Sequence, residues 1–212
     1  MKRNHLVRTN LRRGLLGCAL IVAALAVVRT AVADTSALNA TQQFVNTAMH
    51  ILADKQTPMA QRQNQLRDLI EPRFDFTEMS RSALGYHWKS LSPDQRTNFT
   101  GVFKGFMEAA YLSKIGDYSG QHVEFIRQSP LGDGYAQVFT TILQNGKPPI
   151  PINYLLAQKD GDWKVYDVTV ENISIIANYR NQFNRVINEN SFDKLLSDLK
   201  AKQQQLITAA AG

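Results

Sequence analysis

Side chains that could bind a metal ion or catalyse a reaction are few in this sequence and lie far apart. Beyond residue 33 there are three histidines, His50, His87 and His122, separated by 37 and 35 residues. Zinc ligands on one element recur at short spacings, so this pattern does not indicate a metal site. Asp167 lies among apolar neighbours and could be a buried acid with a perturbed pKa. Such an acid more often has a structural partner, for example Arg180.

Sequence motifs of nucleophilic and phosphate-binding enzymes are also missing. The chain contains neither a Gly-x-Ser-x-Gly nucleophile turn nor a glycine-rich phosphate loop. Without a nucleophile, a base and an oxyanion site in view, nothing in the sequence supports a catalytic centre. We therefore predict no catalytic residue, no metal ligand, no cofactor and no enzymatic activity.

The net positive charge of the chain comes from its N-terminus. Six of the 24 Lys and Arg residues, and none of the 18 acidic residues, lie in residues 1–33. The remaining 179 residues carry 18 basic and 18 acidic side chains, and so lack the basic field that nucleic-acid binding requires. A basic segment, an apolar run from Gly14 to Val28 and the small residues Ala31-Val32-Ala33 together predict a signal peptide cleaved before Asp34.

The leader has two alternative interpretations, an uncleaved membrane anchor and a lipoprotein signal. Its apolar run is shorter than the roughly 20 residues of a membrane-spanning helix, which disfavours an uncleaved anchor. Leu15 to Cys18 looks like a lipobox, but mostly apolar residues continue beyond the cysteine, which disfavours lipidation. Export through a cleaved leader predicts a mature chain, 34–212, in an oxidising compartment outside the cytoplasm. Cys18 is the only cysteine, so this mature chain has none and cannot form a disulfide.

Apolar spacing predicts helices at both ends of the mature chain. The expected helices cover residues 36–53, 58–73, 77–84, 93–115, 175–187 and 192–206. Thr77 is the expected N-cap of the third, and Gly85 ends it. The clearest start signal is Ser92-Pro93-Asp94-Gln95, in which Ser92 and Gln95 form a capping box.

Between these helices the period changes to that of strands. Four strands are expected over residues 122–128, 135–144, 150–158 and 163–170, separated by the turn sequences 129–134, Asn145-Gly146 and Asp160-Gly161. Short turns between consecutive strands indicate an antiparallel meander. The predicted fold class is therefore α+β: a single domain over 34–212, in which N- and C-terminal helices wrap a twisted four-stranded antiparallel sheet.

The helix that begins at Ser92 has more aromatic surface than most helices of its length. Phe99, Phe103, Phe106 and Tyr111 recur on it at helical spacing. Close packing in a core is the more common reason for such a stripe, and a ligand cavity between helix and sheet is the alternative. Spacing alone leaves both open.

One segment resembles a known signature. Trp163 to Phe183 looks like the signature of the MlaC family, periplasmic phospholipid-binding proteins also described as toluene-tolerance auxiliary transport components. Further similarity lies in Phe74-Asp75-Phe76, Ser80 to Trp88, Pro93 to Phe103 and Pro149 to Tyr154. The resemblance spans roughly Asp34 to Leu206. Asn172 departs from the pattern, because the family usually has glycine there; asparagine tolerates a left-handed backbone better than most residues.

The resemblance implies a soluble lipid carrier. Such proteins take phospholipid as cargo between an outer-membrane lipoprotein–porin complex and an inner-membrane ABC transporter, whose MCE-domain subunit receives the carrier, and so maintain outer-membrane lipid asymmetry. On this basis we expect the acyl chains to insert between the helix 93–115 and the inward face of the sheet. The expected lipid-binding residues are Val102, Phe103, Phe106, Met107, Tyr111, Val138, Thr140, Ile142, Ile152, Tyr154, Leu156, Val165 and Ile176.

Three alternatives remain from the sequence. A related carrier could take another lipid, such as a hopanoid. A small-molecule enzyme on a similar scaffold would need a polar cluster in its cavity, for example Asp167 with Tyr154. A periplasmic chaperone would show an exposed apolar groove and no bound lipid.

Overall fold

Capping side chains set the helix boundaries in the N-terminal half. In the computed structural model, which describes residues 36–112 and 118–211, Ser36 caps the first helix and Asp75 caps the third, each accepting a hydrogen bond from a backbone amide three residues on. Asp75 thus replaces the predicted cap Thr77, because the helix begins one residue earlier, at Phe76. The predicted signal peptide lies outside the described residues.

The predicted capping box is confirmed. Gln95 N donates to Ser92 Oγ at 3.2 Å, and Ser92 N donates to Gln95 Oε1 at 2.9 Å. The helix that this box opens is described as far as Leu112, and the last predicted residues, 113–115, lie outside the described part. The described helices are α1 (Ala37–Ala53), α2 (Met59–Ile70), α3 (Phe76–Leu84), α4 (His87–Ser90), α5 (Pro93–Leu112), α6 (Ile175–Glu189) and α7 (Phe192–Ala211).

The sheet is an antiparallel meander, as predicted, with a short strand added at one edge. The strands of the described residues are β1 (His122–Gly132), β2 (Tyr135–Leu143), β3 (Ile150–Lys159), β4 (Asp162–Val170) and β5 (Ile173–Ser174), in the order β1-β2-β3-β4-β5. Glu171 and Asn172 form the β4–β5 turn with φ of +52° and +66°. A two-residue hairpin turn needs such positive φ, and asparagine adopts it more readily than most residues other than glycine.

The first strand is longer than expected. It continues through Pro130 to Gly132, whereas its predicted end was Gln128. Proline is tolerated because β1 is an edge strand, where one side of the backbone needs no partner in the sheet. The turn to β2 therefore shrinks to Asp133-Gly134.

Asp167 joins the sheet to α6. Its Oδ2 accepts a hydrogen bond from Ser174 Oγ at 2.5 Å, and its Oδ1 accepts from the amides of Val168 and Ile176 at 2.8 and 3.2 Å. Ser174 in turn caps α6 by accepting from Ala177 N. The partner expected from the sequence was Arg180, whose Nε instead donates to the carbonyl of Ser82.

We expect Asp167→Ala to lower the free energy of unfolding by about 2–3 kcal/mol, because three hydrogen bonds to a charged acceptor are lost together. Ser174→Ala, which removes the cap alone, should cost about 1 kcal/mol. Equilibrium urea unfolding of the two variants measures the difference. Equal losses would show that the carboxylate adds nothing beyond holding Ser174.

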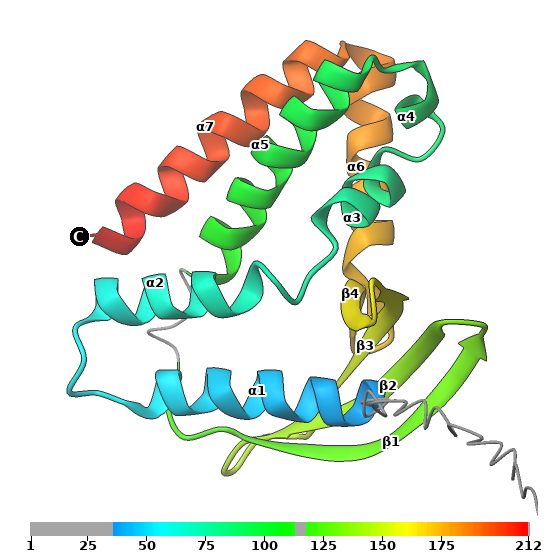
Figure 1. The fold of residues 1–212 in the computed structure, drawn as a ribbon. Helices are drawn as coiled ribbons and strands as arrows, with labels where there is room; N and C mark the ends of the chain where they lie inside the picture. The colour runs from blue at the N-terminus through cyan, green and yellow to red at the C-terminus, as the bar shows by residue number, and fades with distance from the viewer. Residues whose placement is uncertain (1–35, 113–117, 212) are drawn as a thin grey trace, which may run out of the picture. The chain divides into compact units, whose positions relative to one another are not determined.

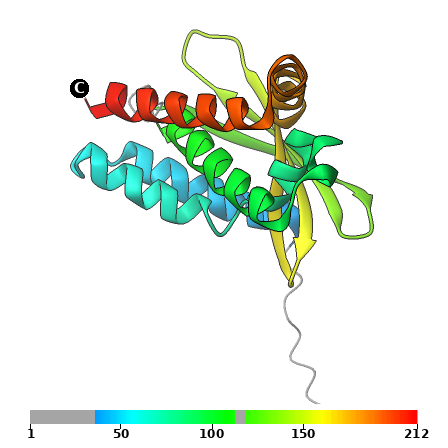
Figure 2. The same cartoon turned by 90° about the horizontal axis from the view of Figure 1, so that it is seen from above.

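Helices and sheet form two packed regions that meet along β4. α5 and α7 lie side by side, as do α1 and α2 (Figures 1 and 2). α1 contacts β1 and β2, whereas α3 and α6 contact β4. The largest core cluster joins α3, α5, α6 and α7, and a second cluster joins α1 to the sheet through Ala37, Val138 and Leu156.

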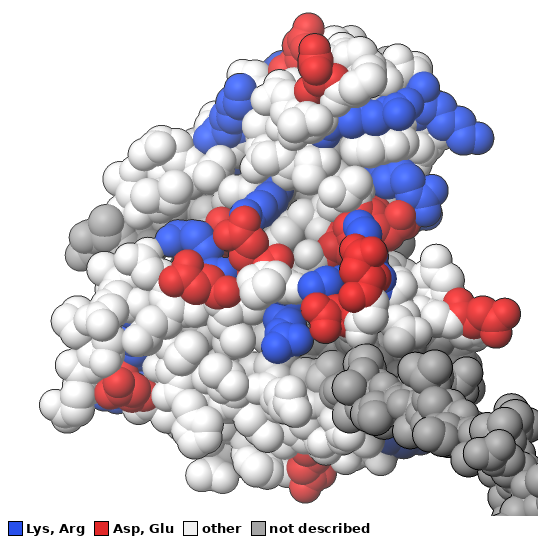
Figure 3. Space-filling model, viewed as in Figure 1, with Lys and Arg blue, Asp and Glu red and all other residues white. Residues whose placement is uncertain are grey.

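The described residues belong to one compact unit, Thr35–Gly212. Lys, Arg, Asp and Glu are intermixed on the face shown in Figure 3, so no single-sign patch dominates it. Among the described helices, none combines the length and apolar character that crossing a membrane requires.

Candidate ligand-binding cavity

An apolar cavity lies between the sheet and the helices. Its volume is about 260 Å³, and among the described residues that line it Glu108 is the only charged one. The lining residues are Phe44, Ile70, Phe74, Phe76, Met79, Met107, Glu108, Tyr111, Ile152, Tyr154, Val168, Val170 and Ile175. They come from α1, the end of α2, the α2–α3 connection, α3, α5, the strands β3 and β4, and the start of α6, so the cavity exists only in the assembled fold.

A second apolar cavity adjoins the first. It measures about 430 Å³ and shares Ile70 and Tyr111 with the 260 Å³ cavity. Leu52 of α1, Val123 of β1 and Ile142 of β2 lie on its walls. The shared residues make the two spaces neighbouring compartments, and their volumes lie in or near the range typical of small-molecule sites.

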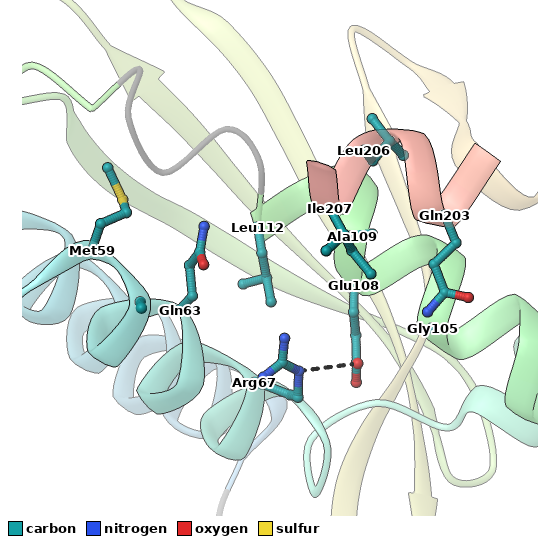
Figure 4. Close-up of a pocket in the computed structure, with 11 residues that line it drawn as sticks. Met59, Gln63, Arg67, Gly105, Glu108, Ala109, Leu112, Gln203, Leu206 and Ile207 are labelled. Carbon is teal, nitrogen blue, oxygen red and sulfur yellow. Dashed lines mark ion pairs between the residues drawn. The ribbon is translucent and has the colours of Figure 1, made fainter. Parts of the chain in front are cut away.

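A third space, a groove of about 520 Å³, opens between α2, α5 and α7. In Figure 4, Arg67 from α2 faces Glu108 from α5, and Gln203 extends from α7 on the opposite wall. Arg67 Nε lies 3.4 Å from Glu108 Oε2. Glu108 also lines the 260 Å³ cavity, so this residue lies between the apolar interior and a groove whose walls carry both polar and apolar side chains.

Burial controls the ionisation of the groups that line these spaces. Desolvation raises the pKa of Glu108 above its ordinary value, although Lys104 and Arg67 oppose the rise. Burial also raises the pKa of Tyr154 to about 12 and raises that of Tyr111, so both hydroxyls stay neutral at physiological pH. The interior therefore presents carbon and neutral hydroxyl groups, with one carboxyl at its edge.

The raised pKa of Glu108 predicts a pH dependence of stability. Between the pKa of an unfolded-state glutamate and the higher folded-state value, the folded protein keeps a proton that the unfolded chain has lost. The free energy of unfolding should therefore fall as the pH rises through that window. Urea unfolding of lipid-free protein from pH 4 upward, compared with Glu108→Gln, isolates this contribution. A glutamine variant with the same pH slope as the wild type would contradict it.

The structure divides the thirteen residues predicted from the sequence into two groups. Five line the two apolar cavities: Met107, Tyr111, Ile142, Ile152 and Tyr154. Seven lie in packed clusters or against them: Val102, Phe103, Phe106 and Ile176 among the helices, and Val138, Leu156 and Val165 between α1 and the sheet. Thr140 is buried, and its hydroxyl donates to the carbonyl of Ile152.

Several lining residues were missed by sequence reasoning. Regular alternation would place Val165 on one face of β4 and Val168 and Val170 on the other. A register shift opposite Leu155 and Leu156 changes the alternation by one residue, so Val168 and Val170 line the cavity on the face to which Val165 also points. Phe44 lies in a segment predicted as ordinary helix. Phe74 and Phe76 lie between the predicted helices 58–73 and 77–84, in a motif that carried the family resemblance but was not assigned to the cavity. Only folding brings these three rings to the sheet.

The His, Asp and Glu side chains of the described residues lie too far apart to share a metal ion. Residues 36–112 and 118–211 contain no group of three or more His, Cys, Asp or Glu side chains that could hold a metal ion. His87 Nε2 lies 3.0 Å from Asn184 Oδ1, on the surface of the helical region. Asp167 uses both oxygens in the hydrogen bonds to Ser174 and to α6, and Tyr154 lines the cavity without it.

A helical layer and a sheet with two adjoining apolar cavities between them, and a groove of mixed polar and apolar lining at one side, define a binding protein for an apolar or amphiphilic ligand. Comparison with known proteins identifies the group. A family model described as MlaC protein matches residues 42–201. The chain belongs to the MlaC family.

Individual relatives agree with this assignment. The intermembrane phospholipid transport system binding protein MlaC of Haemophilus influenzae is 27% identical over 195 residues, which cover 88% of this chain and 91% of the relative. Toluene tolerance protein ttg2D of Pseudomonas putida is 27% identical over 147 residues, covering 65% of this chain and 68% of the relative. A phospholipid-binding protein from Ralstonia solanacearum, solved in complex with a phospholipid, superposes with a TM-score of 0.67 at 28% identity, covering 78% of this chain and 98% of that one.

Proposed function

We propose that this protein is a periplasmic phospholipid carrier that holds acyl chains in the cavities between α5 and the sheet. The observation that carries the proposal is the pair of adjoining apolar cavities in a chain of the MlaC family. The solved relative from Ralstonia solanacearum, which contains a phospholipid, supports the choice of cargo. Met107, Tyr111, Ile142, Ile152 and Tyr154, with Val168 and Val170, are the residues that we propose contact the chains.

Elementary energetics explain why such a carrier needs these cavities. Exposing a methylene group to water costs about 0.8 kcal/mol, so two chains of about 15 carbons represent on the order of 24 kcal/mol. A free phospholipid therefore crosses an aqueous compartment very slowly. A protein interior as apolar as the membrane nearly balances this free energy, and transfer then needs little net driving force and no catalytic group.

The proposed route follows from the family. After removal of residues 1–33, the single domain 34–212 would accept phospholipid from one membrane and pass it to another. We propose an outer-membrane lipoprotein–porin complex and the MCE-domain subunit of an inner-membrane ABC transporter as the two partners. ATP hydrolysis at the transporter would then supply directionality, because the carrier binds its cargo with little bias.

Solvent extraction of the purified mature protein, followed by lipid mass spectrometry, tests the proposal. We expect near-stoichiometric phospholipid. A hopanoid or other neutral lipid in its place would redirect the proposal to another cargo. A folded sample without any lipid would contradict a carrier function and would favour packing as the reason for the aromatic residues of α5.

A further inference from the structure

We propose that Glu108 is a proton-binding site coupled to the cargo: the protein takes up a proton at this carboxyl when lipid fills the apolar cavity, and it loses affinity for lipid as the pH rises. The inference rests on the proposed function, because it assumes that acyl chains occupy the 260 Å³ cavity. It adds the local pH as a condition that controls loading and release of the cargo.

Glu108 places an ionisable carboxyl beside a space lined otherwise by carbon and phenol groups. Among the described residues that line the 260 Å³ and 430 Å³ cavities, it is the only charged one, and none is a histidine. Its side chain is only 10% exposed, and its buried Oε1 accepts no hydrogen bond from the described residues. A negative charge on such an oxygen is unfavourable, because neither water nor a donor stabilises it.

Two cations face Glu108, but each is shared with another group. Arg67 Nε of α2 lies 3.4 Å from Glu108 Oε2 (Figure 4), and Nη1 of the same guanidinium donates to Asn64 Oδ1. Lys104 Nζ lies 3.9 Å from Glu108 Oε1 and is paired more closely with Glu71. Glu71 is itself a carboxylate and opposes a second negative charge nearby. The two cations therefore stabilise the ionised form of Glu108 only in part.

The other walls supply no further positive charge. The α7 residues that line the groove beside Glu108 are neutral. Tyr111 and Tyr154 in the cavity also stay neutral, because burial raises the pKa of both phenols. In the lipid-free protein, desolvation already outweighs Lys104 and Arg67, so the pKa of Glu108 lies above its ordinary value.

Lipid in the cavity would shift this balance further in the same direction. An acyl chain displaces water from the cavity and brings neither charge nor a hydrogen-bond donor to Glu108, so the ionised form becomes less favourable. The pKa of Glu108 is then higher in the loaded than in the empty protein. Below both pKa values the affinity for lipid is constant and highest. Between them binding takes up a proton, and the affinity falls by up to about tenfold per pH unit.

Partition from vesicles across a pH series tests the coupling. Lipid-free mature protein is equilibrated with phosphatidylcholine vesicles from about pH 5 to about pH 9, at ratios that leave the protein partly loaded, and the bound lipid is measured by mass spectrometry. This headgroup has no group that titrates in the range, so the vesicles keep the same charge. We expect partition into the wild-type protein to fall on the order of tenfold as the pH rises.

Variants assign the pH dependence to one carboxyl. Glu108→Gln, which resembles the protonated form, should bind lipid equally well across the series. Arg67→Gln should move the fall in partition to higher pH, because it removes a cation that favours the ionised form. Asp68→Asn is the matched control: its carboxylate is exposed on α2 beside Arg67 but lines neither cavity, and this variant should behave like the wild type.

The outcomes separate this inference from the carrier function. Wild-type protein that binds lipid equally at every pH would overturn the proton coupling and leave the carrier function intact. A Glu108→Gln variant with the pH dependence of the wild type would do the same, because another group would then be responsible. Wild-type protein that binds no lipid at any pH would overturn both.

Discussion

Ile152→Asp is expected to abolish phospholipid binding while leaving the protein folded. Ile152 lines the 260 Å³ cavity and is partly exposed within it, so a carboxylate there can be hydrated when the cavity is empty. Acyl chains would strip that water and leave an unpaired charge against hydrocarbon, at several kcal/mol. We expect the affinity for phospholipid to fall by more than about a hundredfold. Lipid extraction and circular dichroism of the same sample measure binding and folding together.

Ile126→Asp is the matched control, because it places the same charge on β1 at a side chain that is 57% exposed to solvent. This variant should retain lipid at the wild-type level. If Ile152→Asp copurified with stoichiometric phospholipid and unfolded like the wild type, the acyl chains would have to lie elsewhere.

Phe103→Ala is expected to lower the free energy of unfolding by about 3–5 kcal/mol. Phe103 is fully buried in the helical cluster. Its ring centroid lies 5.7 Å from that of Phe99, 5.4 Å from that of Phe183 and 5.6 Å from that of Tyr179. Truncation would leave a void among rings that are held on two helices, α5 and α6, and cannot all collapse into it. Equilibrium urea unfolding gives the loss directly.

Ile173→Ala provides the comparison, since this side chain is 66% exposed and its truncation should change stability by no more than about 0.5 kcal/mol. The pair also separates the two readings of the aromatic stripe. A Phe103→Ala variant with wild-type stability but no bound lipid would show that Phe103 contacts cargo, as expected from the sequence. A Phe103→Ala variant that loses the expected stability would show that Phe103 packs the helices together.

Local chemistry was sufficient to predict most of the secondary structure. The capping box at Ser92, the turn Asp160-Gly161 and the change of period after residue 121 each depend on neighbours within a few residues. The antiparallel order follows as well, because short turns can join only adjacent antiparallel strands. The additional strand β5 was not predicted, because its two residues are too few to show the alternation of apolar and polar side chains that indicates a strand.

The cavity could be predicted only in outline. Sequence periodicity shows that one face of α5 is apolar, but packed and cavity-lining residues are equally apolar. Phe103 and Met107 lie one turn apart on that face, yet Phe103 lies in the helical core and Met107 also reaches the cavity. Which of them meets open space depends on where α1 and the α2–α3 connection come to lie.

By itself, then, the sequence determined the class of fold, the family resemblance and the absence of recognisable catalytic motifs, because these reside in local pattern and residue order. Only the tertiary structure decided which side chains of β4 face the cavity on either side of its register shift. It also brought Phe44, Phe74 and Ile152 together around one cavity. It also placed Glu108 beside Arg67. Contacts between residues tens of positions apart depend on how whole elements pack, and packing geometry leaves no period in the chain.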